Sequence, residues 1–216
     1  MYGNGYEITN GELYLYNFLE PKCSVIFDVG AGENTYYATN NSITYHMFES
    51  YQPVFEKFRE KVKDRPNIKI SNIALGAEKV TLPFYYSFGM SFVKRINTAH
   101  SDMQIETSTL DDYVKSHGID HIDFLKIDTE GWELNVLKGS IESFNIITHI
   151  QFEYGGTWPE GGFHLQEARE LLESHGYSLY IIIPQGITAV PDFSDHGRYC
   201  NYFATKKVED VKEIIR

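Results

Sequence analysis

Short apolar runs along this chain alternate with segments of helical periodicity. Many of these runs have the length of a buried strand and stop at Gly, Asp or Glu. The predicted strands span residues 24–29, 43–48, 68–74, 80–86, 122–127, 146–152, 177–183 and 199–205, of which 80–86 fits a strand or a hairpin arm. Helices are predicted at 53–63, 109–118, 130–137 and 164–175, with a short one between the first two strands. This alternation predicts an α/β fold, Rossmann-like, with a mainly parallel central sheet and helices on both faces.

The chain length of 216 residues suits one domain. Residues 1–22 form an amphipathic pattern that predicts a helical lead-in, and residues 23–216 are predicted to form the single domain. No apolar stretch approaches the roughly 18 residues needed to span a bilayer, and the first residues lack the pattern of a signal peptide. We therefore expect a cytoplasmic protein without a membrane partner.

Charge and cysteine content narrow the classes of partner. A formal charge of −11 repels a phosphate backbone, and Lys and Arg form no basic stripe, so we expect no nucleic acid partner. Cys23 and Cys200 are far apart and belong to no Cys-x-x-Cys pair, which is consistent with a reducing compartment.

Acidic residues and glycines follow the predicted strands, where an open α/β sheet binds its ligands. These segments are Asp28 to Gly32, Glu49, Ala74 to Gly76, Asp128 to Gly131, and Glu153. Gly30 and Gly32 let the backbone approach a ligand closely, and Glu49 is placed to accept hydrogen bonds from ribose hydroxyls. This arrangement predicts an adenosine-containing cofactor. The alternative is that the glycines only form a tight turn and that Glu49 caps the next helix.

The residues around the two glycines distinguish between adenosine-containing cofactors. A dinucleotide fingerprint requires a third glycine, and Thr35 stands at that position. Asp28 would repel a pyrophosphate but attract a sulfonium or amino group, which favours S-adenosylmethionine. A nicotinamide-dependent oxidoreductase and a non-catalytic nucleoside-binding module remain the alternatives.

A series of motifs in this chain resembles, in order, those of the FkbM family of methyltransferases. The motifs are Val25-Ile26-Phe27-Asp28-Val29-Gly30-Ala31-Gly32, Phe48-Glu49-Ser50, Asn72-Ile73-Ala74-Leu75-Gly76, Thr109-Leu110-Asp111-Asp112-Tyr113, Ile122-Asp123-Phe124-Leu125-Lys126-Ile127-Asp128-Thr129-Glu130-Gly131-Trp132-Glu133 and Val136-Leu137-Lys138-Gly139. The resemblance covers about Val25 to Glu153. It implies a class I methyltransferase fold, S-adenosylmethionine as methyl donor and hydroxyl acceptors, often on sugars.

The resemblance also implies roles for individual residues. Those predicted to bind the donor are Asp28, Gly30 and Gly32 at the methionine end, Glu49 at the ribose, Ile73 and Ala74 on the adenine side, and Ser50, Asp128 and Glu130 elsewhere in the site. One departure is Glu33-Asn34-Thr35, which replaces the small residues usual after the second glycine.

A sugar hydroxyl needs a general base to accept its proton, and three residues are candidates. Asp128 and Glu153 end predicted central strands, and His164 opens a helix. Asp128 could instead cap the helix predicted from Glu130, and His164 could be a capping or surface residue. Glu133 is expected to be solvated or paired.

Asp128 and Glu153 are also the candidate ligands of a divalent metal, Mg²⁺ or Mn²⁺. Because no third ligand is evident, metal dependence is the less favoured hypothesis.

The segment from Tyr154 to Phe163 carries the predicted acceptor contacts. Tyr154, Trp158 and Phe163, together with Lys126, are expected to bind a carbohydrate or glycoside. The segment fits a substrate lid, or a connector whose aromatic residues fill a gap. Lys126 fits a partner of an acid at the site, or a side chain that reaches the sheet edge. A neighbouring glycosyltransferase domain or enzyme stays open as a partner.

Overall fold

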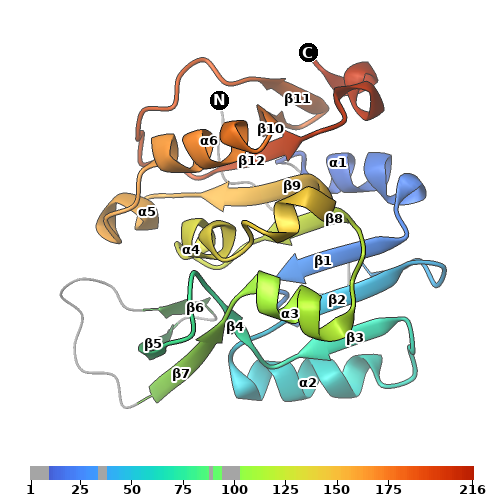
Figure 1. The fold of residues 1–216 in the computed structure, drawn as a ribbon, viewed down its shortest axis with the longest axis vertical. Coiled ribbons are helices and arrows are strands. Elements are labelled where there is room, and N and C mark those ends of the chain that lie inside the picture. The colour runs from blue at the N-terminus through green and yellow to red at the C-terminus, as the bar shows by residue number, and fades with distance from the viewer. Residues whose placement is uncertain (1–9, 34–37, 88–89, 94–102) are drawn as a thin grey trace.

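The computed structural model describes residues 10–33, 38–87, 90–93 and 103–216. The strands of its central sheet are β1 (Val25–Val29), β2 (Thr44–Phe48), β3 (Ile68–Ser71), β8 (Ile122–Ile127), β9 (Ile147–Tyr154), β10 (Ser178–Ile183), β11 (Gly186–Ala189) and β12 (Cys200–Thr205). Their order is β11-β10-β12-β9-β8-β1-β2-β3 (Figure 1). Strands β3, β2, β1, β8 and β9 pair in parallel, whereas β12 is antiparallel to both of its neighbours and β11 is antiparallel to β10. The predicted mainly parallel α/β sheet is therefore confirmed.

Helices cover both faces of the sheet, as the alternation predicted. The helices are α1 (Glu12–Leu19), α2 (Gln52–Val62), α3 (Leu110–His117), α4 (Glu133–Lys138), α5 (Thr157–Glu160) and α6 (Leu165–Ser174). Neighbouring strand residues pack in opposite cores because their side chains alternate: Phe27 lies with α3, α4 and α6, and Ile26 lies with α1 and α2. None of the helices in the described residues is long and apolar enough to cross a membrane.

A smaller sheet stands beside the edge where β1 and β8 end (Figure 1). Its strands are β4 (Ala74–Leu75), β5 (Thr81–Ser87), β6 (Met90–Val93) and β7 (Met103–Ser108), in the order β4-β7-β5-β6. The single strand predicted at 68–74 is divided between the two sheets. Between its halves, the Asn72 side chain donates to the backbone oxygens of Glu49 and Ser50. Residues 80–86 were predicted to form a strand or a hairpin arm, and β5 is one arm of the hairpin that it forms with β6.

Helix boundaries follow the local backbone. The Thr109 side chain accepts a hydrogen bond from the Asp112 amide at 3.0 Å, so the predicted cap of α3 is present. Helix α4 begins at Glu133 rather than at Glu130, because Glu130 and Gly131 have φ values of 58° and 103°. The short helix expected after β1 is absent from residues 30–33 and 38–43, and residues 34–37 lie outside the described part of the chain.

The strand register brings the predicted site segments to one edge. Val29 of β1 pairs with Phe48 of β2 and with Ile127 of β8, and Ile127 pairs with Phe152 of β9. The turns that follow these four strands are therefore neighbours, and the start of β12 joins them because Cys200 pairs with Tyr154.

Replacing Gly30 with Ala should disrupt this edge. Gly30 has a φ of 86°, and a Cβ there would lie 1.8 Å from the carbonyl oxygen of Asp128. We expect Gly30→Ala to lower the free energy of unfolding by about 2 kcal/mol or more, measured by denaturant titration. Gly32→Ala is the control, because a Cβ at Gly32 meets no atom within 4 Å although φ is 59°. Equal losses in the two variants would contradict the close approach of Gly30 to Asp128.

Candidate active site

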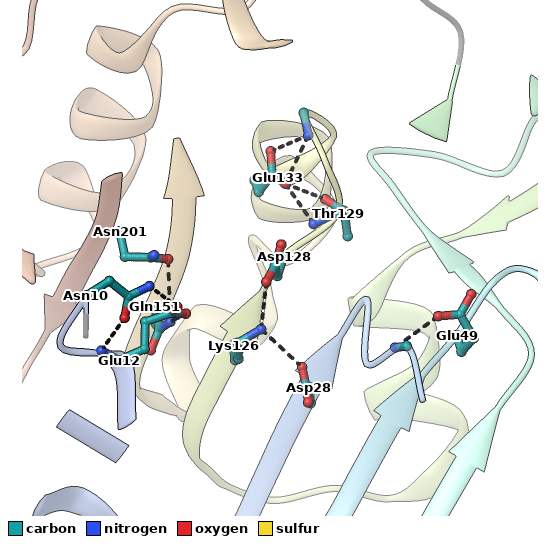
Figure 2. A network of polar contacts seen from close by, with 12 residues as sticks. Asn10, Glu12, Asp28, Glu49, Lys126, Asp128, Thr129, Glu133, Gln151 and Asn201 are labelled. Atoms are coloured by element: carbon teal, nitrogen blue, oxygen red, sulfur yellow. Dashed lines mark hydrogen bonds and ion pairs between the residues drawn. The ribbon is translucent and has the colours of Figure 1, made fainter. Parts of the chain in front are cut away.

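The glycine turn after β1 is bonded to the end of β2. The amides of Gly30 and Ala31 both donate to the Phe48 carbonyl at 3.0 Å. Glu49 is buried, and its carboxylate accepts from the amides of Gly32 (3.0 Å) and Tyr51 (2.7 Å) (Figure 2). Burial raises the pKa of the Glu49 carboxyl, and these two hydrogen bonds oppose that shift. The structure thus places Glu49 beside the glycine turn, where the donor prediction needs it.

Lys126 joins the ends of the two central strands. Its Nζ lies 2.9 Å from Asp128 Oδ2 and 3.9 Å from Asp28 Oδ1 (Figure 2). Lys126 and Asp28 are paired in register and are both about 95% buried, so a buried ammonium compensates a buried carboxylate. Lys126 therefore pairs with site acids and does not reach the sheet edge. The Asp128 side chain binds Lys126, so the predicted alternative that it caps a helix is not what the structure describes.

Glu133 is fully buried beneath the turn that follows β8. Its carboxylate accepts from the Thr129 amide (2.7 Å) and hydroxyl (3.1 Å), from the Gly131 amide (3.1 Å) and from the Trp158 indole (2.7 Å). Glu133 was predicted to be either solvated or paired. The structure shows it paired and completely buried. Burial raises the pKa of the carboxyl, and the backbone hydrogen bonds oppose the shift.

Glu153 lies near the end of β9, at the same edge of the sheet, and is partly buried. Burial raises its pKa to about 9, and the negative charges of Asp128, Glu133 and Glu130 act in the same direction. At neutral pH the side chain is therefore a neutral acid. It can donate a hydrogen bond but cannot take a proton, which argues against its predicted role as the base.

His164 lies at the N-cap position of α6 and is exposed. Its Nδ1 is 2.6 Å from Asp195 Oδ2, and this pairing raises the pKa of His164. Asp195 also accepts from the Leu165 amide and the Tyr154 hydroxyl. No contact among the described residues joins His164 to Asp128 or Glu153, so the placement favours the capping interpretation over the base.

The aromatic residues at the end of β9 and in the segment after it are packed into the protein. Tyr154 and Trp158 are 0% and 1% exposed, so the prediction that they contact an acceptor conflicts with their burial in the core. Phe163 is half-buried with its ring 6.0 Å from that of Trp132. The segment therefore matches a connector with gap-filling aromatic residues better than an open lid.

The residues predicted to lie on the adenine side of the donor are at the start of the small sheet. Ala74 is buried in β4, while half-buried Ile73 lines a shallow concavity with Tyr113 and His117 of α3. Ser50 is half-buried beside Glu49, and its carbonyl accepts from Asn72. These residues adjoin the end of β2, and their contacts with a donor stay a prediction.

A buried polar cluster beside the site was not predicted. Gln151 of β9 donates to Glu12 of α1 and, at 3.5 Å, to Asn201 of β12, and Asn10 donates to Glu12 (Figure 2). Gln151 pairs in register with Lys126, so both side chains lie on the α1 face. The sequence signal was a polar residue at alternate positions of an apolar strand, Gln151 and Glu153.

The described part of the chain offers no complete set of ligands for a metal ion. It contains no group of three or more His, Cys, Asp or Glu residues that could hold an ion. Asp128 and Glu153 remain a pair without a third ligand there.

Comparison with known proteins identifies the family. The sequence profile described as the methyltransferase FkbM domain matches residues 28–179, more than half of the chain. The chain belongs to the FkbM methyltransferase family. The predicted resemblance is thus confirmed, and no curated protein matches the chain.

Solved structures similar to this FkbM chain share its fold at low sequence identity. The FkbM methyltransferase of Methylobacillus flagellatus KT is 17% identical with a TM-score of 0.52, over 84% of this chain and 43% of that protein. A precorrin-6y C5,15-methyltransferase from Geobacter metallireducens is 13% identical (TM-score 0.51, covering 94% of each chain). A methyltransferase-like protein from Streptococcus mutans, solved in complex with SAH, is 9% identical (TM-score 0.51, 90% and 97%). The class I methyltransferase fold is confirmed, and this chain spans less than half of the Methylobacillus protein.

In this FkbM chain, Glu153→Gln should become more stabilising as pH rises. The folded-state pKa of about 9 lies above the ordinary value of 4.5, so the stability contributed by protonated Glu153 is complete below about pH 4.5 and is lost as pH rises through 9. Gln cannot ionise. The gain over wild type should therefore grow across this window by at most about 1.4 kcal/mol per pH unit, measured by denaturant titration at several pH values. Glu142→Gln, at an exposed position, should show a constant difference. A pH-independent gain for Glu153→Gln would contradict its protonated state.

Proposed function

We propose that this chain is an S-adenosylmethionine-dependent O-methyltransferase acting on a sugar hydroxyl of a glycan or glycoside. The observation that carries the proposal is the glycine turn held between two buried acids: Gly30 packs on the Asp128 carbonyl, Asp28 precedes the turn, and Glu49 binds the Gly32 amide. A protein of the same fold was solved in complex with SAH, which supports this donor.

The charge of the edge suits a cationic donor. Asp28, Asp128 and Glu130 come from the ends of two adjacent strands, and the ammonium of Lys126 compensates the two aspartates. A sulfonium and an ammonium group are attracted by the remaining negative charge, whereas a pyrophosphate is repelled. The same charge disfavours a phosphorylated acceptor and favours a neutral one.

Gly32 would lie against the methionine end of the donor, and Glu49 would hold its ribose. A Cβ at Gly32 would meet no atom, so the backbone there has open space beside it. When bound, S-adenosylmethionine supplies an electrophilic methyl group for a nucleophilic oxygen. The protein then has to orient the acceptor and remove its proton.

Asp128 is the residue we assign as general base. Its side chain is 30% exposed, so an acceptor can reach it, and Lys126 binds Oδ2, so Oδ1 is the atom to meet a hydroxyl. Neutral Glu153 is suited to donate a hydrogen bond to the acceptor, and His164 lies outside this cluster. Asp128 would accept the hydroxyl proton as the acceptor oxygen bonds to the methyl carbon and the carbon–sulfur bond of the donor breaks, which would leave S-adenosylhomocysteine.

The proposed acceptor class rests on the family resemblance and on the negative charge of the site, which favours a neutral acceptor. We propose a deoxysugar such as rhamnose or fucose at a glycan end, delivered by a neighbouring glycosyltransferase domain or enzyme.

Calorimetric titration with S-adenosylmethionine, and with NAD as the comparison ligand, tests the donor. We expect saturable binding of S-adenosylmethionine at one site and no binding of NAD, because the acids at the edge oppose a pyrophosphate. Binding of NAD alone would instead support the nicotinamide-dependent oxidoreductase. Donor binding without SAH release from any glycan would support the non-catalytic module.

Glu49→Gln should weaken S-adenosylmethionine binding. The amide keeps the shape of the side chain but replaces one acceptor oxygen with a donor, so a charge-assisted hydrogen bond to ribose is lost, about 1.5–3 kcal/mol in calorimetric affinity. Glu33→Gln is the matched control, since Glu33 is an exposed carboxylate one residue past the turn and pairs with Lys57. Unchanged affinity in Glu49→Gln would remove Glu49 from the ribose site.

A further inference from the structure

Two segments at the active edge share one buried carboxylate. Residues 128–132 form the turn after β8, and residues 155–163 form the segment after β9 that includes α5. Glu133 Oε1 accepts from the Thr129 amide at 2.7 Å, and Glu133 Oε2 accepts from the Trp158 indole at 2.7 Å. Because Glu133 is 0% exposed, no water competes for these bonds. One side chain therefore bonds both segments.

The turn after β8 has a backbone that needs such support. Glu130 is the non-glycine residue with positive φ among those described, at 58°, and Gly131 follows at 103°. A left-handed conformation is unfavourable for Glu and persists when surrounding contacts enforce it. The Gly131 amide lies 3.1 Å from both oxygens of Glu133 (Figure 2 shows this carboxylate with Thr129), so Glu133 supplies that enforcement.

Packing joins the same two segments a second time. A Cβ at Gly131 would lie 2.7 Å from Thr157 Cβ and Oγ1, so the turn lies directly on α5. The rings of Trp132 and Phe163 also meet edge to face. The hydrogen bonds of Glu133 are therefore made across an interface that is already closely packed.

On its other side, the turn touches the predicted donor site. The Asp128 amide donates to the Val29 carbonyl at 2.9 Å, and Gly30 packs against the Asp128 carbonyl. A continuous series of contacts thus runs from Trp158 through Glu133 and this turn to Gly30. A shift of α5 reaches the glycine turn through neighbouring atoms.

We propose that Glu133 and Trp158 are positioning residues whose hydrogen bond couples the segment after β9 to the donor-binding turn. The inference rests on the proposed function for the identity of the donor. Trp158 is 1% exposed and would not touch the donor, yet it would set the donor affinity through Glu133. A change in the position of the segment after β9 would then change the affinity of the donor site.

Trp158→Phe tests the coupling, because it removes the indole N–H and retains an aromatic ring. We expect the Kd of S-adenosylmethionine, measured calorimetrically, to rise about fivefold or more. Tyr177→Phe is the matched control: its buried hydroxyl donates to the Ile147 carbonyl at 2.8 Å, at the opposite end of β9. This variant should also lose one buried hydrogen bond but should bind the donor as wild type does. Equal weakening by both variants, or by neither, would overturn the proposal.

Hydrogen exchange tests the same coupling without a ligand. The amides of Thr129 and Gly131 should exchange faster in Trp158→Phe than in wild type, and at the wild-type rate in Tyr177→Phe. If wild type fails to bind S-adenosylmethionine, the proposed function fails, and the exchange rates still decide the coupling. The combined loss of donor affinity in Glu133→Gln with Trp158→Phe should be smaller than the sum of the two single losses, because both changes act on the hydrogen bond between Trp158 and Glu133. Additive losses of donor affinity, or unchanged amide exchange rates at Thr129 and Gly131 in Trp158→Phe, would contradict the proposed coupling.

Discussion

The ammonium of Lys126 compensates the two aspartates at the ends of the strands on which the site is built: Asp28 lies on the neighbouring strand β1, and Asp128 directly follows β8, the strand of Lys126 itself. Three charges gathered at the end of adjacent parallel strands are stable only because the ammonium lies between the carboxylates. The backbone pairing of β1 with β8 brings Gly30 against the Asp128 backbone. The turns after the two strands then form one surface, from which the contacts of Glu49 and Glu133 extend.

The acids of the site have different environments and therefore different chemistry. Glu49 and Glu133 are buried but accept backbone amides, which favour a carboxylate against the effect of burial. Asp128 has an ammonium partner and reaches solvent. Glu153 faces negative charges instead, and its proton is retained. Carboxyl side chains at one edge of the sheet thus provide structural hydrogen-bond acceptors, a candidate base and a neutral hydrogen-bond donor.

The two faces of the central sheet are also unequal. The face toward α3, α4 and α6 carries aromatic and aliphatic residues, while the α1 face places Asp28, Lys126 and Gln151 on three adjacent strands in matching register. Buried polar groups need partners, and α1 supplies one by bringing Glu12 to Gln151. The N-terminal helix therefore completes the polar side of the site as well as covering the sheet.

Patterns and motifs in the sequence were enough to predict the fold class, the segments that follow the central strands and the family. Apolar runs, the Thr109 cap and the motifs each depend on residues that are close together in the sequence. The structure confirms the cap, and the family match confirms the motifs. The burial of Glu133, the position of Trp158 in the core and the raised pKa of Glu153 emerged from the folded structure alone. It also brought together Gln151 and Glu12, which are 139 positions apart. Burial and hydrogen-bond partners depend on elements distant in the chain, so periodicity and spacing could not predict them.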